Sequence, residues 1–159
     1  MRAPAAAPAP EAADGLRAEV VADGLRAEVI AALRRAGFDP PDPTVVDVVT
    51  AVGAGYRKGP ADAPISLGSV ADRAVADAFV GFYRLGASTT DIDRETHRHV
   101  VRATVDMDLA QLGPAGTSDA ARAVLTAIAL GIWDPEQDEH AKANALAGYV
   151  GSWYRAGLA

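Results

Sequence analysis

The longest helical pattern in the chain runs from Thr90 to Leu112 and contains no glycine or proline. At about 100° per residue, its apolar and small residues fall on two roughly opposite arcs. The first arc is Ile92, Thr96, Val100, Ala103, Met107 and Ala110. The second arc is Val101, Val105, Leu109 and Leu112. Because a helix with two apolar faces usually has neighbours on both sides, the pattern predicts that helix 90–112 lies at the centre of the fold.

Five other segments repeat apolar residues at helical spacing, approximately over residues 13–35, 43–54, 69–85, 118–132 and from 135 onward. Capping signals mark most of their ends. The expected starts are Asp42 with Pro43, a capping box of Ser69 with Asp72, Ser118, and Asp134 with Pro135 and Gln137. Gly37 and Gly86 are the expected stops of the first and third helices. Segment 118–132 has almost no charge after Arg122, so we expect it to be the most buried helix apart from the central one.

The N-terminal segment contains a near-exact duplication, because ADGLRAEVV at 13–21 is followed by ADGLRAEVI at 22–30. Nine residues turn a helix by about 900°, which places corresponding side chains of the two copies on opposite sides. Leu25, Val29 and Leu33 continue one stripe, whereas Leu16 faces away from it. We therefore expect the second copy to pack on the core and the first to project or to meet another chain.

Length and composition narrow the class of protein. A chain of 159 residues fits one domain, so we expect a helical domain over 13–159 and a disordered Ala/Pro tail over 1–12. The net charge of −6 and the absence of a Lys/Arg cluster make nucleic acid and anionic membranes unfavourable partners. No apolar run approaches the ~20 residues that span a bilayer, and the N-terminus lacks the apolar block of a signal peptide. The default location is the cytoplasm.

Two histidines on the long helix are the candidates for acid/base chemistry. His97 follows Asp93 by one helical turn, and His99 follows Glu95 at the same spacing. A carboxylate can hold one imidazole tautomer and raise its basicity, which a general base needs. The alternative in each case is an ordinary surface pair on a helix.

No cofactor or metal site is expected from the motifs. His97 and His99 point about 200° apart, so a regular helix cannot direct both at one ion. Glu136 and His140 have the same i, i+4 spacing near the start of the last helix, and the Glu-x-x-His pairs of di-iron bundles are lacking. The chain also lacks cysteine, a GxSxG motif and a phosphate-binding glycine loop.

Large aromatic side chains supply the candidate ligand site. We expect an interhelical pocket for a small apolar or aromatic molecule, although the same rings could simply fill the core of an alanine-rich protein. Its lining would be Phe79, Tyr83, Met107, Trp133, Tyr149 and Trp153. A face of small residues on the last helix would allow either a close internal contact or a homodimer seam. This face is Ala141, Ala145, Gly148 and Ser152.

The sequence therefore predicts an all-α, single-domain bundle of about six helices around helix 90–112. Two functions remain open. The first is a binding module for a small molecule or a protein partner. The second is a small cofactor-independent enzyme, an isomerase, cyclase or lyase, that uses His97 with Asp93 or His99 with Glu95.

Overall fold

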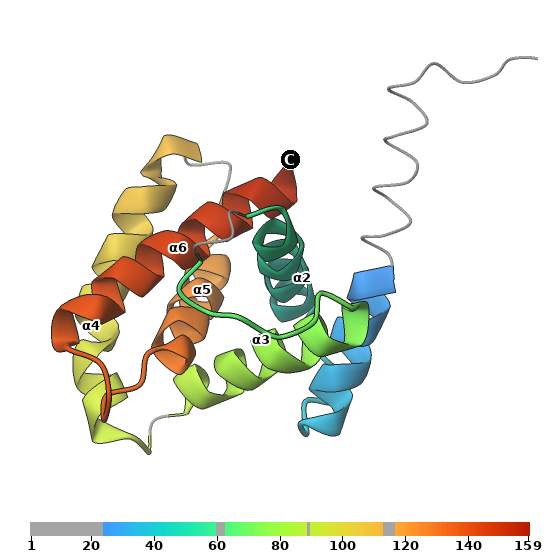
Figure 1. Ribbon diagram of the computed structural model, residues 1–159, viewed down its shortest axis with the longest axis horizontal. Helices are drawn as coiled ribbons and strands as arrows, with labels where there is room; N and C mark the ends of the chain where they lie inside the picture. The colour runs from blue at the N-terminus through green and yellow to red at the C-terminus, as the bar shows by residue number, and fades with distance from the viewer. Residues whose placement is uncertain (1–23, 60–62, 89, 113–116) are drawn as a thin grey trace, which may run out of the picture.

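The computed structural model describes residues 24–59, 63–88, 90–112 and 117–159, and within them the chain forms an all-helical bundle with no strand (Figure 1). The N-terminal helix is described over 24–35. It is followed by α2 (Pro43–Lys58), α3 (Asp72–Ala87), α4 (Ile92–Leu109), the short 3-10 helix η1 (Ala110–Leu112), α5 (Asp119–Ile132) and α6 (His140–Leu158). The predicted all-α bundle is confirmed. The expected tail at 1–12 and the first copy of the duplication lie outside the described residues.

The helix at the centre of the bundle is α5, not the segment 90–112. Every residue from Val124 to Gly131 is buried, and α5 contacts α2, α3, α4 and α6. Figure 1 shows α5 in the interior and α4 at one edge. On α4 the arc of Val101, Val105 and Leu109 is buried, but the other arc is open to solvent. A helix that is apolar on all sides can be surrounded, whereas α4 carries charged flanks that need water or polar partners.

Glycines allow two pairs of helices to touch backbone to backbone. A Cβ placed on Gly86 of α3 would lie 1.6 Å from the carbonyl oxygen of Ala127, and one on Gly131 of α5 would lie 1.8 Å from that of Phe82. Gly55 of α2 and Gly157 of α6 form the equivalent contact between those helices. Gly86 was expected to end α3, but the helix continues to Ala87. Its role is close approach rather than termination, because a side chain there would overlap the next helix.

Side chains at the helix starts confirm some of the expected caps and correct others. Asp42, which directly precedes α2, accepts a hydrogen bond from the Thr44 amide. Ser118, which directly precedes α5, accepts one from the Ala121 amide. The capping box of Ser69 and Asp72 does not form, because Ser69 bonds to the Ala71 amide and Asp72 pairs with Arg57. The set Asp134, Pro135 and Gln137 forms a turn, and α6 begins later, at His140. As a result, Glu136 and His140 do not share a helix.

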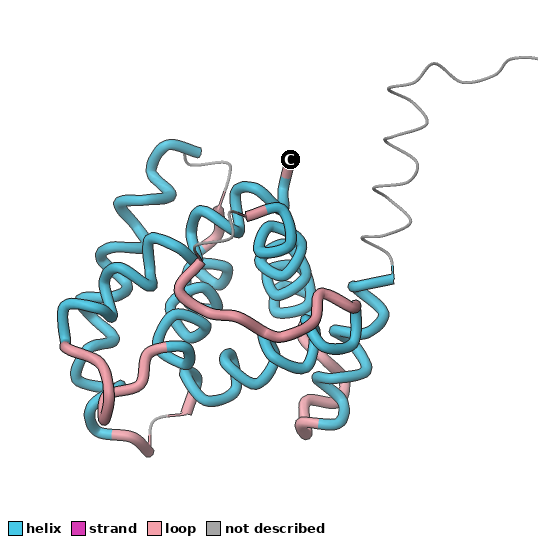
Figure 2. The backbone as a smooth tube through the Cα atoms, viewed as in Figure 1, coloured by secondary structure: helices cyan, strands magenta, loops and turns pink. Residues whose placement is uncertain are grey.

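The loop of residues 63–71, which leads into α3, passes across the bundle (Figure 2). The Tyr56 hydroxyl holds it by accepting a hydrogen bond from the Leu67 amide at 3.3 Å and donating one to the Ile65 carbonyl at 3.4 Å. The ring of Tyr56 also packs against Phe79 and Trp153. This loop is thus fixed to the aromatic core.

The second copy of the duplicated segment packs on the core, as the sequence predicts. Leu25, Val29 and Leu33 are fully buried, and Arg26 forms an ion pair with Asp47 of α2. The core therefore receives one copy of ADGLRAEV within the described residues.

Removing residues 22–30 joins the first copy to Ala31 and reproduces the natural helix with valine in place of Ile30. We expect this chain to fold with a free energy of unfolding about 1 kcal/mol below that of the chain lacking 13–21, which keeps Ile30. Urea unfolding of the two deletion variants measures the difference. Failure of the 22–30 deletion to fold, when the 13–21 deletion folds normally, would show that the copies are not equivalent.

Candidate functional site

Arg94 fixes the start of α4 to the end of the central helix. Its Nε donates to the Leu130 carbonyl and its Nη2 to the Trp133 carbonyl, both at 2.9 Å, and its third nitrogen pairs with Asp91. The side chain is buried. The carbonyls at the end of α5 have no partner within their own helix, so a guanidinium placed there satisfies them. Sequence reasoning missed Arg94, although it lies in line with Val101 and Val105 on the buried arc.

Asp91 is the N-cap of α4. Its carboxylate accepts hydrogen bonds from the amides of Asp93 and Arg94. The backbone hydrogen bond from Arg94 is the main cause that lowers the pKa of Asp91, and the Arg94 guanidinium adds to it. The pKa of Asp119 is lowered by a hydrogen bond from Arg102, and that of Asp138 by one from Lys142.

These lowered pKa values predict loss of stability in acid. A carboxyl whose pKa is lower in the folded chain stabilises the fold above its unfolded pKa, about 3.8, and this contribution is lost as the pH falls through the folded pKa. We expect the urea midpoint to fall between pH 5 and about pH 3, and to fall less in Asp91→Asn than in the natural chain. Asp93→Asn is the matched control, since its carboxylate makes no ion pair with the described residues. An equal acid response in Asp91→Asn and the natural chain would contradict the assignment.

The flank of α4 that carries His97, Thr104 and Asp108 faces α6. The ring of His97 lies 4.5 Å from that of His140 and 4.7 Å from that of Trp133, measured between centroids. Thr104 lies 3.4 Å from the Asn144 amide oxygen, and Asp108 forms an ion pair with Arg155 at 2.8 Å. This polar flank is therefore an interhelical contact.

His97 and His99 do not hydrogen-bond to the carboxylates that were predicted to pair with them. His97 Nδ1 bonds to the backbone carbonyl of Asp93 at 3.0 Å rather than to its carboxylate. Because a carbonyl oxygen only accepts, this contact selects the tautomer of the neutral imidazole that has its hydrogen on Nδ1 and its lone pair on Nε2. Glu95 bonds to Arg98 at 3.0 Å instead of to His99, which is exposed. For Glu95 the local cause is competition, since the guanidinium of Arg98 is a stronger partner for a carboxylate than an imidazole.

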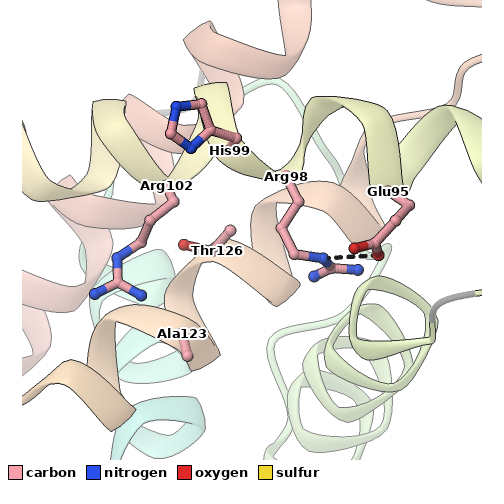
Figure 3. Close-up of a pocket in the computed structure, with 6 residues that line it drawn as sticks. All are labelled: Glu95, Arg98, His99, Arg102, Ala123 and Thr126. Carbon is pink, nitrogen blue, oxygen red and sulfur yellow. Dashed lines mark hydrogen bonds and ion pairs between the residues drawn. The ribbon is translucent and has the colours of Figure 1, made fainter.

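A shallow groove of about 350 Å³ runs between α4 and α5. Its lining is Glu95, Arg98, His99, Arg102, Ala123 and Thr126 (Figure 3). The charges in it are already paired, because Arg98 bonds to Glu95 and Arg102 bonds to Asp106 and Asp119. Figure 3 shows the His99 ring turned away from both guanidinium groups. The groove therefore offers no free charge of one sign to a ligand.

The six residues predicted to line one aromatic pocket lie in separate places. Phe79 and Trp153 pack on each other in the core, and Tyr149 covers Trp153 from the surface. Trp133 is buried beside His97, and Tyr83 contacts Phe38. Met107 is 76% exposed. The structure thus brings the rings of Phe79, Tyr149 and Trp153 together and places those of Tyr83 and Trp133 against other residues. The rings fill the spaces that the many alanines leave in the core.

One arc of α4 forms an apolar surface outside the core. Its large members are Ile92 (79% exposed), Val100 (45%) and Met107 (76%). The small residues Thr96 and Ala103 between them, and Ala110 at the start of η1, are also exposed. We call these six residues the α4 face. The small-residue face of α6 is likewise open, since Ala141, Ala145 and Ser152 are exposed and nothing lies within 4 Å of a Cβ built on Gly148. The predicted internal contact on α6 is therefore absent from the described part, and the homodimer seam remains a prediction.

No protein-family model, curated protein or solved structure matches this chain. Within the described ranges, no three His, Asp or Glu side chains gather closely enough to hold a metal ion. None of the helices in those ranges combines the length and apolar character that a bilayer crossing requires.

Proposed function

We propose that this protein is a non-catalytic binding module that holds an apolar helix of a protein partner on the α4 face. The observation that carries the proposal is the exposure of Ile92, Val100 and Met107 along one side of a helix whose other side is anchored in the core. Isolated exposed apolar residues are common, but an aligned series of them marks an interaction surface. The charged groove beside it lacks the enclosed apolar character of a small-molecule site.

The shape of the α4 face favours a helix as the occupant. Residues four apart on a helix form ridges, and here Ile92, Thr96 and Val100 form one ridge while His99, Ala103 and Met107 form the next. The shallow furrow between two such ridges accepts the ridge of another helix. A convex surface of this kind does not enclose a small ligand, and the acidic chain does not attract an anionic membrane.

A library of helical peptides displayed on phage tests this function. The full chain is immobilised at low density, so that chains do not meet, and binders are counter-selected on the double variant Ile92→Glu/Met107→Glu. We expect peptides with an apolar i, i+4 ridge that bind the natural chain at least tenfold more tightly than the double variant. Val70→Glu, which changes a residue that is 63% exposed elsewhere on the surface, is the matched control and should bind normally. If no selected peptide depends on residues 92 and 107, the proposal fails.

A second candidate function, acid/base catalysis, is favoured by the hydrogen bond of His97. With Nδ1 held by the Asp93 carbonyl, Nε2 is the free base, and its ring lies beside His140. An isomerase, cyclase or lyase would use this nitrogen for proton transfer. Turnover of a panel of carbonyl and alkene compounds tests it. Activity that disappears in His97→Gln would support this candidate, and activity unchanged in that variant, or none across the panel, would eliminate it.

A further inference from the structure

The packing of α4 against α6 brings two of the three histidines of the chain together. The ring centres of His97 and His140 lie 4.5 Å apart, with the ring planes inclined by 72°. The third histidine, His99, is exposed and lines the groove between α4 and α5 instead. We call His97 and His140 the histidine pair. Its members are far apart in sequence, so only the folded chain holds them side by side.

The spacing of the histidine pair fits two ligands of one metal ion. A zinc ion lies about 2.1 Å from each imidazole nitrogen that binds it, and the ring centre lies about 1 Å farther away. On a tetrahedral ion, two ring centres are therefore about 5 Å apart, close to the 4.5 Å of the structure. Because the His140 side chain is exposed, its ring can turn a nitrogen toward an ion without disturbing the core.

The hydrogen bond of His97 prepares its other nitrogen for a metal ion. Nδ1 bonds to the backbone carbonyl of Asp93 at 3.0 Å, which selects the neutral tautomer with the lone pair on Nε2. Metal-binding histidines commonly donate their second ring N–H to a carbonyl or carboxylate in this way, because the bond fixes the ring and makes the ligand more basic. This observation is independent of the spacing between the rings.

The charges around the histidine pair favour a cation. Asp93, Glu136 and Glu139 are exposed acidic residues within four positions of one or the other histidine. The ammonium group of Lys142 is bonded to Asp138 at 3.0 Å. Because carboxylates lining a surface raise the local concentration of positive ions, this end of α4 and α6 attracts a metal ion rather than an anion.

From this geometry we infer that the histidine pair binds a divalent first-row transition-metal ion of the kind that favours imidazole, such as Zn²⁺ or Cu²⁺. Two imidazoles are fewer than the three protein ligands of a catalytic zinc site, so water completes the coordination. The ion fastens the start of α6 to α4. The inference does not rest on the proposed function, because the histidine pair lies on the flank of α4 that packs on α6 and not on the α4 face.

Titration of the full chain with Cu²⁺ tests the site, because Cu²⁺ binds such ligands more tightly than the other divalent ions of its row. Trp133, whose ring lies 4.7 Å from that of His97, should report binding through saturable quenching of its fluorescence at pH 7. Electron paramagnetic resonance of the bound Cu²⁺ should show two imidazole nitrogens. His97→Gln and His140→Gln should each weaken binding at least tenfold and leave one imidazole nitrogen in the spectrum.

His99→Gln is the matched control, since it removes an imidazole from α4 outside the histidine pair, and it should bind Cu²⁺ as the natural chain does. Position 140 is exposed, so His140→Gln keeps the fold and its weaker binding reports the lost ligand. Equal binding by the natural chain and His140→Gln, or equal weakening in His99→Gln, would indicate an adventitious ion only and overturn the inference. Absence of Cu²⁺ binding to the natural chain would overturn it as well.

Discussion

Gly86→Ala should lower the free energy of unfolding by at least about 3 kcal/mol and Tm by about 10 °C. The new Cβ would lie 1.6 Å from the Ala127 carbonyl oxygen and 2.9 Å from the Gly131 nitrogen, both backbone atoms. Backbone cannot rotate away as a side chain can, so α3 and α5 must move apart along their contact. Because α5 is the centre of the bundle, the displacement reaches the helices that pack on its other sides. Thermal and urea unfolding measure the loss.

Gly81→Ala provides the matched control on the same helix. Nothing lies within 4 Å of a Cβ built at Gly81, and the position is exposed. Alanine there should stabilise the chain by about 0.5–1 kcal/mol, because it has the better helix propensity and loses less backbone entropy on folding. If the two substitutions had effects of the same sign and size, the close contact between α3 and α5 would be contradicted.

Arg94→Leu should cost about 3 kcal/mol of stability. The leucine fits the buried position but leaves the Leu130 and Trp133 carbonyls without the two donors that now satisfy them, and leaves Asp91 without its guanidinium. The end of α5 and the start of α4 should both loosen. Amide hydrogen exchange at these two helix ends, followed together with urea unfolding, measures the effect.

Arg94→Lys distinguishes the hydrogen bonds from the charge. A lysine keeps the positive charge beside Asp91, but its single ammonium cannot reach three separate acceptors in the geometry of a guanidinium. We expect it to recover less than half of the loss. Full recovery by lysine would show that only the ion pair matters, and an unaffected Arg94→Leu chain would remove Arg94 as the link between the two helices.

The helical pattern was sufficient to predict the fold class and most helix positions. The β-branched and leucine positions at helical spacing marked the buried faces of α2, α3, α5 and α6, and Asp42 and Ser118 acted as the expected caps. These features are local, so they can be read from neighbouring residues. The end of α3 was missed because a glycine that stops a helix and one that lets another helix approach look the same in sequence.

The arrangement of the helices depended on information that the pattern does not contain. The sequence does not indicate which of the two apolar arcs of α4 is buried, yet only the arc with Val101 and Val105 lies in the core. Periodicity reports amphipathicity but does not say which of two faces finds a neighbour within the same chain. The approach of His97 to His140 was likewise hidden, since it depends on how α4 and α6 pack and not on residue spacing.

Maleimide labelling of Ala103→Cys is the most direct test of the claim that another helix covers the α4 face. Residue 103 is exposed near the middle of the face, and the thiol would be unique in the chain. We expect its labelling rate to fall at least tenfold when a phage-selected helical peptide is added, while the rate for Val70→Cys stays constant. Labelling of residue 103 that remains as fast as that of residue 70 in the presence of the peptide would contradict the claim.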